Sequence, residues 1–206
     1  SSSANAFGTG TNLQNLRQDP DWRKDDGRYK ISLRKIFIAD PGMKICGIDL
    51  EQAESREVGY QLGVLFDDWT YLDACEAGDL HTVTCKLIWP DLPWTGDAKA
   101  DRKIADQNFY HQFSYRDMSK RGGHGSNYLG TPFTMARHLK VPQKLMDNFQ
   151  HAYFRAYPIP RWHTWTAGQI QTIQQLTTPF GRRRHFFGRP NDDTTLREAV
   201  AYVPQS

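Results

Sequence analysis

The sequence predicts an α+β protein that is mainly helical, and three observations carry this prediction. Residues 51–66 have helical periodicity, with an apolar stripe made by Ala53, Val58, Leu62 and Leu65. Residues 36–49 hold two apolar runs on either side of a Pro-Gly pair, a pattern that favours two strands joined by a turn. A further hairpin is predicted around Gly181, with a run of arginines on one arm.

Length and composition narrow the class of protein. At 206 residues and 23.8 kDa, the chain is long enough to bury a core in one large or two small domains. Its net charge of +3 permits a nucleic-acid partner without requiring one. The three cysteines have no CxxC spacing, so we expect a reduced, intracellular compartment and no disulfide framework. The sequence holds no apolar run long enough to cross a membrane.

The remaining elements follow from periodicity and from the positions of glycine and proline. Residues 1–30 and 90–101 read as loops. Asp193 or Thr194 is expected to cap the last helix. Helices are predicted at residues 69–76, 79–89, 108–121, 131–139, 142–157, 162–176 and 193–203.

The stretch 116–130 carries the clearest chemical signal. On a helix, a spacing of four residues brings cations, an imidazole and a phenol onto one ridge, formed by Arg116, Lys120, His124 and Tyr128. Such a ridge suits an anionic and aromatic ligand, for which phosphate and a base are the obvious candidates. Each glycine costs a helix about 1 kcal/mol relative to alanine. Three of them therefore predict a helix end or a close ligand approach at Gly122, Gly123 and Gly125.

Taken singly, other polar residues have a plain structural interpretation beside the functional one. Asp49, between a strand and a helix, is a helix cap or a metal ligand. His81 is a surface residue or an anion contact in a first helical turn. The amides of residues 12–15 satisfy a loop backbone or meet a nucleic-acid groove. The arginines of residues 182–184 form a solvated edge or a phosphate contact.

The order of these segments resembles the family A DNA polymerases, the group of bacterial polymerase I and many phage replicases. Residues 49–56, Asp-Leu-Glu-Gln-Ala-Glu-Ser-Arg, resemble motif A of the family, and Asp79-Leu80-His81 resembles a short motif of the fingers. The 116–128 ridge resembles motif B. Weaker likenesses lie in residues 1–15, at Gly181-Arg182-Arg183 and in residues 197–205.

The resemblance implies an incomplete right-hand polymerase fold, with a mainly helical fingers subdomain on part of an antiparallel-sheet palm. It implies palm over residues 1–66, fingers over 67–175, and a return toward the palm over 176–206. The family's motif C has a His-Asp pair, but no histidine of this sequence precedes an acidic residue. We therefore expect the second metal-binding aspartate to come from a C-terminal segment or a second polypeptide, and this chain alone to be inactive.

The implied activity is template-directed DNA synthesis, in which two Mg²⁺ ions assist attack of a primer 3'-hydroxyl on a dNTP. The resemblance assigns metal binding to Asp49 and the Leu50 carbonyl, and catalysis to Asp49, Arg116 and Lys120. It assigns nucleotide binding to Gln52, Glu54, His81, His124 and Tyr128, with Glu54 excluding a ribose 2'-hydroxyl. Contacts to primer-template DNA are implied for Asn12, Gln14, Asn15, Arg197 and Gln205.

This sequence also departs from the family's pattern. His124 stands where Phe or Tyr is usual, Leu129 replaces a glycine, and Ala201 replaces an asparagine. The alternatives are a non-catalytic nucleotide- or DNA-binding piece and one part of a split polymerase. A single-subunit RNA polymerase would carry a small residue where Glu54 stands. The expected location is the cytoplasm of a bacterial or phage-infected bacterial cell.

Overall fold

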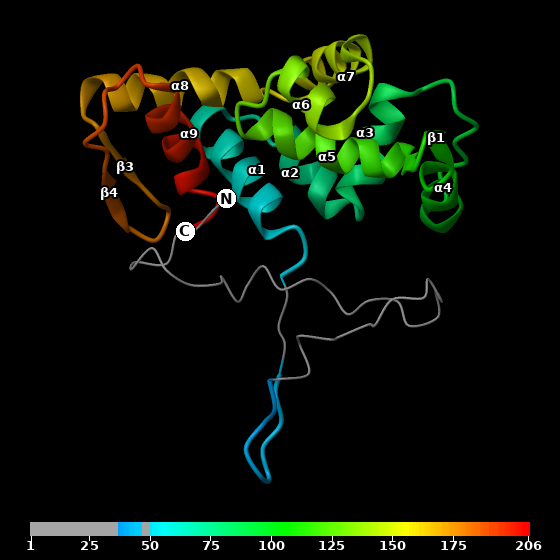
Figure 1. The fold of residues 1–206 in the computed structure, drawn as a ribbon, viewed down its shortest axis with the longest axis horizontal. Coiled ribbons are helices and arrows are strands. Elements are labelled where there is room, and N and C mark those ends of the chain that lie inside the picture. Colours follow the sequence, from blue (N-terminus) through cyan, green and yellow to red (C-terminus); the bar gives the residue numbers. More distant parts are fainter. Residues whose placement is uncertain (1–36, 47–49) are drawn as a thin grey trace. The chain divides into compact units, whose positions relative to one another are not determined.

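A computed structural model describes residues 37–46 and 50–206 of the chain. The chain divides into two units, Ser1–Asp49 and Leu50–Ser206, which are described separately. All regular elements of the described residues belong to the second unit (Figure 1). They are α1 (Ala53–Phe66), α2 (Thr70–Glu76), α3 (Leu80–Ile88), α4 (Ala98–Ala105), β1 (Asn108–Tyr110), β2 (Phe113–Ser114), α5 (Tyr115–Asn127), α6 (Pro132–Leu139), α7 (Gln143–Ala156), α8 (Ile159–Thr172), β3 (Gln175–Thr177), β4 (Arg183–His185) and α9 (Asp193–Tyr202).

The Pro-Gly turn predicted in the first unit is present. The Met43 amide donates to the Asp40 carbonyl at 2.9 Å, and Gly42 takes a positive φ of 83°. The two strands expected beside it are not formed within residues 37–46. An isolated two-stranded hairpin is only marginally stable in water. In the described part of the chain, no further strand lies in position to support a hairpin at residues 37–46 by pairing with it.

Two predictions between residues 90 and 121 are wrong in part. The segment expected to be a loop contains α4, which begins after Asp97, whose carboxylate accepts the Ala100 amide at 2.8 Å. The helix expected from residue 108 begins at Tyr115 instead, because residues 108–114 form the β1–β2 hairpin. A capping box places this start, since Ser114 and Asp117 each bond the other's backbone amide.

The main core lies where α1, α2, α3, α5 and α7 pack together. Their apolar stripes meet around side chains such as Leu62, Met118 and Phe149, which are almost fully buried. In Figure 1 these helices form the middle of the unit, and α6 lies against α7. The stripe predicted for residues 51–66 is confirmed at Val58 and Leu62.

A smaller core joins α8, α9 and the β3–β4 hairpin. Its buried side chains include Ile170, Leu176 and Phe186, and Trp165 packs against both cores. The hairpin around Gly181 is confirmed, with Leu176 opposite Arg184 in an antiparallel register. The helix cap expected at residue 193 or 194 is wrong, because Asp192 caps α9: its carboxylate accepts the Thr194 and Thr195 amides in the first turn.

The mainly helical α+β class is confirmed. The sheets of the described residues are two small antiparallel pairs, β1–β2 and β3–β4. Leu50–Ser206 forms one unit, and the subdomain boundaries near residues 66 and 175 stay predictions. Within residues 37–46 and 50–206, no helix combines the length and apolar character needed to cross a membrane.

Candidate nucleotide site

One cavity collects most of the side chains that the sequence predicts to bind nucleotide. It measures about 170 Å³ and is bounded by five helices, α1, α2, α3, α5 and α7. Ligand pockets for drug-sized molecules are typically about 300–1,000 Å³. The cavity is therefore smaller than a pocket that encloses a whole drug-sized ligand. Its lining includes six of the predicted residues: Gln52, Glu54, His81, Lys120, His124 and Tyr128.

Lys120 and His81 give one side of the cavity its polar character. Lys120 is exposed on α5, and no carboxylate of residues 50–206 forms an ion pair with it. Burial lowers the pKa of His81 to about 4, although the nearby Asp79 acts in the opposite direction. At pH 7 His81 is therefore a neutral imidazole. The ammonium group supplies charge, and the imidazole can donate one hydrogen bond.

Glu54 and Tyr128 close another side of the cavity. The Tyr128 hydroxyl donates to Glu54 Oε2 at 2.7 Å, linking the end of α5 to the first turn of α1. Burial and this hydrogen bond both raise the pKa of Tyr128, and the Gln205 side chain approaches the same hydroxyl. The His124 ring lies edge-on to Tyr128, with ring centroids 4.8 Å apart. Partial burial lowers the pKa of His124.

Gln52 contributes to the frame of the cavity. Its side-chain nitrogen donates to the Gly78 carbonyl at 3.1 Å, and its oxygen accepts the Leu80 amide at 3.2 Å. The amide thus holds the turn between α2 and α3 against the start of α1. Gln52 itself takes a positive φ of 54°. Because both ends of its amide are occupied by backbone, Gln52 positions the wall of the cavity.

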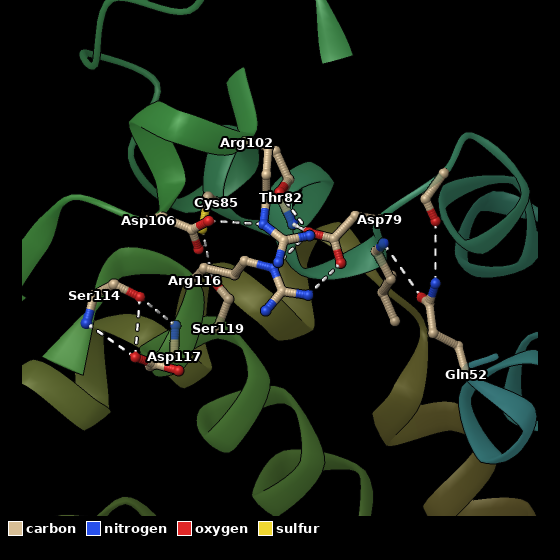
Figure 2. Close-up of polar contacts among 12 residues, drawn as sticks. Gln52, Asp79, Thr82, Cys85, Arg102, Asp106, Ser114, Arg116, Asp117 and Ser119 are labelled. Carbon is tan, nitrogen blue, oxygen red and sulfur yellow. Dashed lines mark hydrogen bonds and ion pairs between the residues drawn. The ribbon is translucent and has the colours of Figure 1, made fainter. Parts of the chain in front are cut away.

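Arg116 is engaged in a bidentate ion pair, shown in Figure 2. Its Nε and Nη2 donate to the two carboxylate oxygens of Asp79 at 2.7 and 2.9 Å. Asp79 also caps α3 by accepting the Thr82 amide. Burial raises the pKa of Asp79, but the hydrogen bonds from Arg116 and Thr82 outweigh it and bring the pKa to about 2. Arg116 does not line the cavity, whereas Lys120, one turn later, does.

The glycines of α5 do not end the helix, and two of them, Gly122 and Gly125, leave no room for a ligand, whereas Gly123 lines the cavity. The helix continues to Asn127, and Gly122 lies against the buried Phe149 ring of α7. A Cβ at Gly122 would come within 2.5 Å of that ring, and one at Gly125 within 2.5 Å of the Met135 sulfur. Both expectations for these two glycines are therefore corrected. They allow neighbouring helices to approach α5 closely.

Sequence reasoning missed the polar floor of the cavity. The Asn127 amide donates to the Tyr71 hydroxyl at 2.9 Å and accepts from the Tyr153 hydroxyl at 3.0 Å. His163 reaches the Asn127 carbonyl at 2.8 Å. These residues come from α2, α5, α7 and α8, so no local spacing links them. The available signal was a tyrosine or asparagine on an otherwise apolar helix face.

Other predicted residues lie apart or outside the described range. Asn12, Gln14, Asn15 and Asp49 are outside it. Leu50 is 73% exposed. Arg197 pairs with Asp193 of its own helix at 2.9 Å. In residues 37–46 and 50–206, no cluster of three His, Cys, Asp or Glu side chains could hold a metal ion.

Comparisons with known proteins agree with the resemblance. No model of a protein family matches the chain. Over 169 residues the chain is 25% identical to "DNA polymerase I, thermostable" of Thermus filiformis, covering 82% of this chain and 18% of that protein. It is 26% identical over 177 residues to the DNA polymerase of Mycobacterium phage D29, covering 85% and 25% respectively.

The fold is similar to a solved polymerase domain. The POL domain of Pol1 from M. smegmatis, solved in complex with DNA primer-template and dNTP, matches with a TM-score of 0.53 and 16% identity. The match covers 75% of this chain and 25% of that one. This chain thus spans a quarter or less of the length of these proteins. By sequence and fold, the chain is similar to part of the family A DNA polymerases.

Proposed function

We propose that the chain takes part in template-directed DNA synthesis and that the cavity between α1, α3 and α5 receives the incoming dNTP. The observation that carries this proposal is the convergence of six separately predicted residues on one cavity. They come from three stretches of the sequence, residues 52–54, 81 and 120–128, so their meeting depends on the fold. The named polymerase relatives support the same reaction class.

The charges at the cavity support a triphosphate as its ligand. Lys120 supplies an ammonium group, and the neutral His81 supplies a hydrogen-bond donor to a phosphate oxygen. In the proposal, both also stabilise charge on the departing pyrophosphate. Arg116 lies one turn before Lys120 and would add a further contact after leaving Asp79.

The opposite side of the cavity supports recognition of sugar and base. In the proposal, Glu54 lies against the sugar and disfavours a 2'-hydroxyl, while Tyr128 lies near the templating base. The hydrogen bond between these two side chains holds them together before a nucleotide enters. Arg197, Gln205 and the amides of Asn12, Gln14 and Asn15 are proposed to face the primer-template duplex.

The described residues do not by themselves fit the Mg²⁺ ions of this reaction, since they contain no suitable cluster. The proposal assigns metal binding to Asp49, the Leu50 carbonyl and a carboxylate from outside these 206 residues. Divalent ions in such reactions stabilise the attacking and leaving oxygens. The binding-only alternatives use the same cavity without this chemistry.

Two assays separate these functions. The 206-residue chain is expected to bind dATP more tightly than 2'-deoxyadenosine, because the phosphates carry the contacts. A longer protein containing this sequence is expected to extend a primer, and Asp49→Asn is expected to abolish extension while dATP binding persists. Nucleotide binding without extension by the longer protein would favour the binding-only function. Equal affinity for 2'-deoxyadenosine and dATP would refute the triphosphate site.

A further inference from the structure

A chain of ion pairs runs beside the cavity and ends at Arg116. Arg102 Nε donates to Asp106 at 2.9 Å, and Arg102 Nη1 lies 3.5 Å from Asp79 Oδ2. Asp79 in turn holds Arg116 by two hydrogen bonds. Figure 2 shows the guanidinium groups of Arg102 and Arg116 on the same side of the Asp79 carboxylate. The carboxylate therefore has one close arginine partner and a second one within reach.

This arrangement makes the two cations of α5 unequal. Arg116 has the shape to grip a phosphate with two parallel hydrogen bonds, but Asp79 already occupies that fork. Lys120 has no such partner among residues 50–206. A phosphate entering beside Lys120 would meet one available cation and one that is neutralised.

We infer that Asp79 is a positioning residue that competes with the bound phosphate for Arg116, and that Arg102 takes over Asp79 when Arg116 leaves. This inference rests on the proposed function. The Asp79 carboxylate is partly buried, and leaving it unpaired would oppose the exchange. The nearby Arg102 removes that obstacle, since it needs to move only from 3.5 Å to hydrogen-bonding distance. Asp79 keeps its capping bonds to Thr82 throughout.

The substitution Asp79→Asn removes the negative charge that pairs with Arg116 but keeps a side chain that can cap α3. Asparagine caps helices about as well as aspartate, so α3 keeps its start. The neutral amide holds Arg116 more weakly. We expect roughly tenfold tighter binding of tripolyphosphate and dATP, the size of one charge-assisted hydrogen bond. Arg102→Gln should act in the opposite direction and weaken binding, because Asp79 then loses its second partner.

The test is a titration of the 206-residue chain with sodium tripolyphosphate and, separately, with dATP. Asp97→Asn is the matched control, since Asp97 caps α4 in the same way and forms no ion pair within residues 50–206. The gain expected from Asp79→Asn should vanish in the double variant with Arg116→Gln. A cap or folding effect would not depend on Arg116 in this way.

A measurement on the wild-type chain tests the inference even if a variant fails to fold. The Nε–H resonance of Arg116 is expected to move on addition of tripolyphosphate, while that of Arg197, also paired with an aspartate, stays in place. An unmoved Arg116 resonance, or Asp79→Asn binding no more tightly than wild type, overturns the inference. If dATP still binds in that case, the proposed function stands. If no variant binds either ligand, both fail.

Discussion

The two faces of α5 differ in what they contribute, although one short sequence motif supplies both. The basic face carries Arg116, Lys120 and His124 toward α3 and the cavity. The packed face carries Met118, Gly122 and Gly125 and is closed by neighbouring helices. Gly122 and Gly125 of the motif serve packing, while Lys120 and His124 line the cavity together with Gly123. Changes on the two faces should therefore affect different measurable properties.

The largest effect is expected on the basic face, for Lys120→Ala. Loss of the ammonium group should weaken dATP binding by a factor of about ten to a hundred, since a hydrogen bond to a charged group is worth about 1.5–3 kcal/mol. The free energy of unfolding should change by less than about 0.5 kcal/mol, because Lys120 is exposed. Isothermal titration and chemical unfolding measure the two quantities. Lys144→Ala, an exposed lysine of α7 outside the cavity, is the control; an equal loss there would contradict the assignment.

On the packed face, Gly122→Ala should lower the free energy of unfolding by about 1–3 kcal/mol. Alanine is the better helix former by about 1 kcal/mol, but its Cβ would meet the buried Phe149 ring at 2.5 Å. Gly168→Ala in α8 is the matched control, because its Cβ meets nothing within 4 Å, and it should stabilise the protein. Folded Gly122→Ala should bind dATP normally. If Gly122→Ala and Gly168→Ala had equal free energies of unfolding, Gly122 would not be needed for the packing of α5 on α7.

Acid should weaken the ion pair that Asp79 forms with Arg116, the first residue of the basic face. The pKa of Asp79 falls from 3.8 to about 2 on folding, so its stabilising contribution is complete above about pH 5 and is lost as pH falls through 2. This contribution amounts to about 2 kcal/mol. The difference in unfolding free energy between wild type and Asp79→Asn should shrink over that range in urea titrations. A difference independent of pH would show that the ion pair does not stabilise the fold.

The smallest effect is expected where the basic face ends. Tyr128→Phe removes the hydrogen bond to Glu54 and should cost about 1 kcal/mol of unfolding free energy. Glu54→Gln keeps an acceptor for the hydroxyl and should cost less. Thermal and urea unfolding of both variants measure this order. A larger loss for Glu54→Gln would mean that Glu54 stabilises the fold through another contact.

Local sequence signals predicted part of this site well. Spacing by four residues identified Lys120 and His124 as neighbours on one helix face, and the Gly181 hairpin followed from turn chemistry. The sequence does not reveal the start of α5, because residues 108–114 hold no glycine or proline that would mark a turn before the capping box at Ser114.

Contacts between residues far apart in the sequence could not be predicted from local sequence patterns. The ion pair between Asp79 and Arg116 spans 37 residues, and the contact between Tyr128 and Glu54 spans 74. The role of Gly122 depends on an aromatic ring 27 positions later, which only the packing of α5 on α7 brings near. For Asp49 and the residues before it, the sequence-based roles stay predictions.

Backbone amide chemical shifts of the 206-residue chain, recorded during a dATP titration, test the central claim most directly. One spectrum contains the amide signals of residues on both faces of α5. We expect the largest shifts at His81, Lys120 and His124, with small ones at Met118 and Gly122. Shifts concentrated on Arg182–Arg184, or equal on both faces of α5, would contradict a nucleotide site in this cavity.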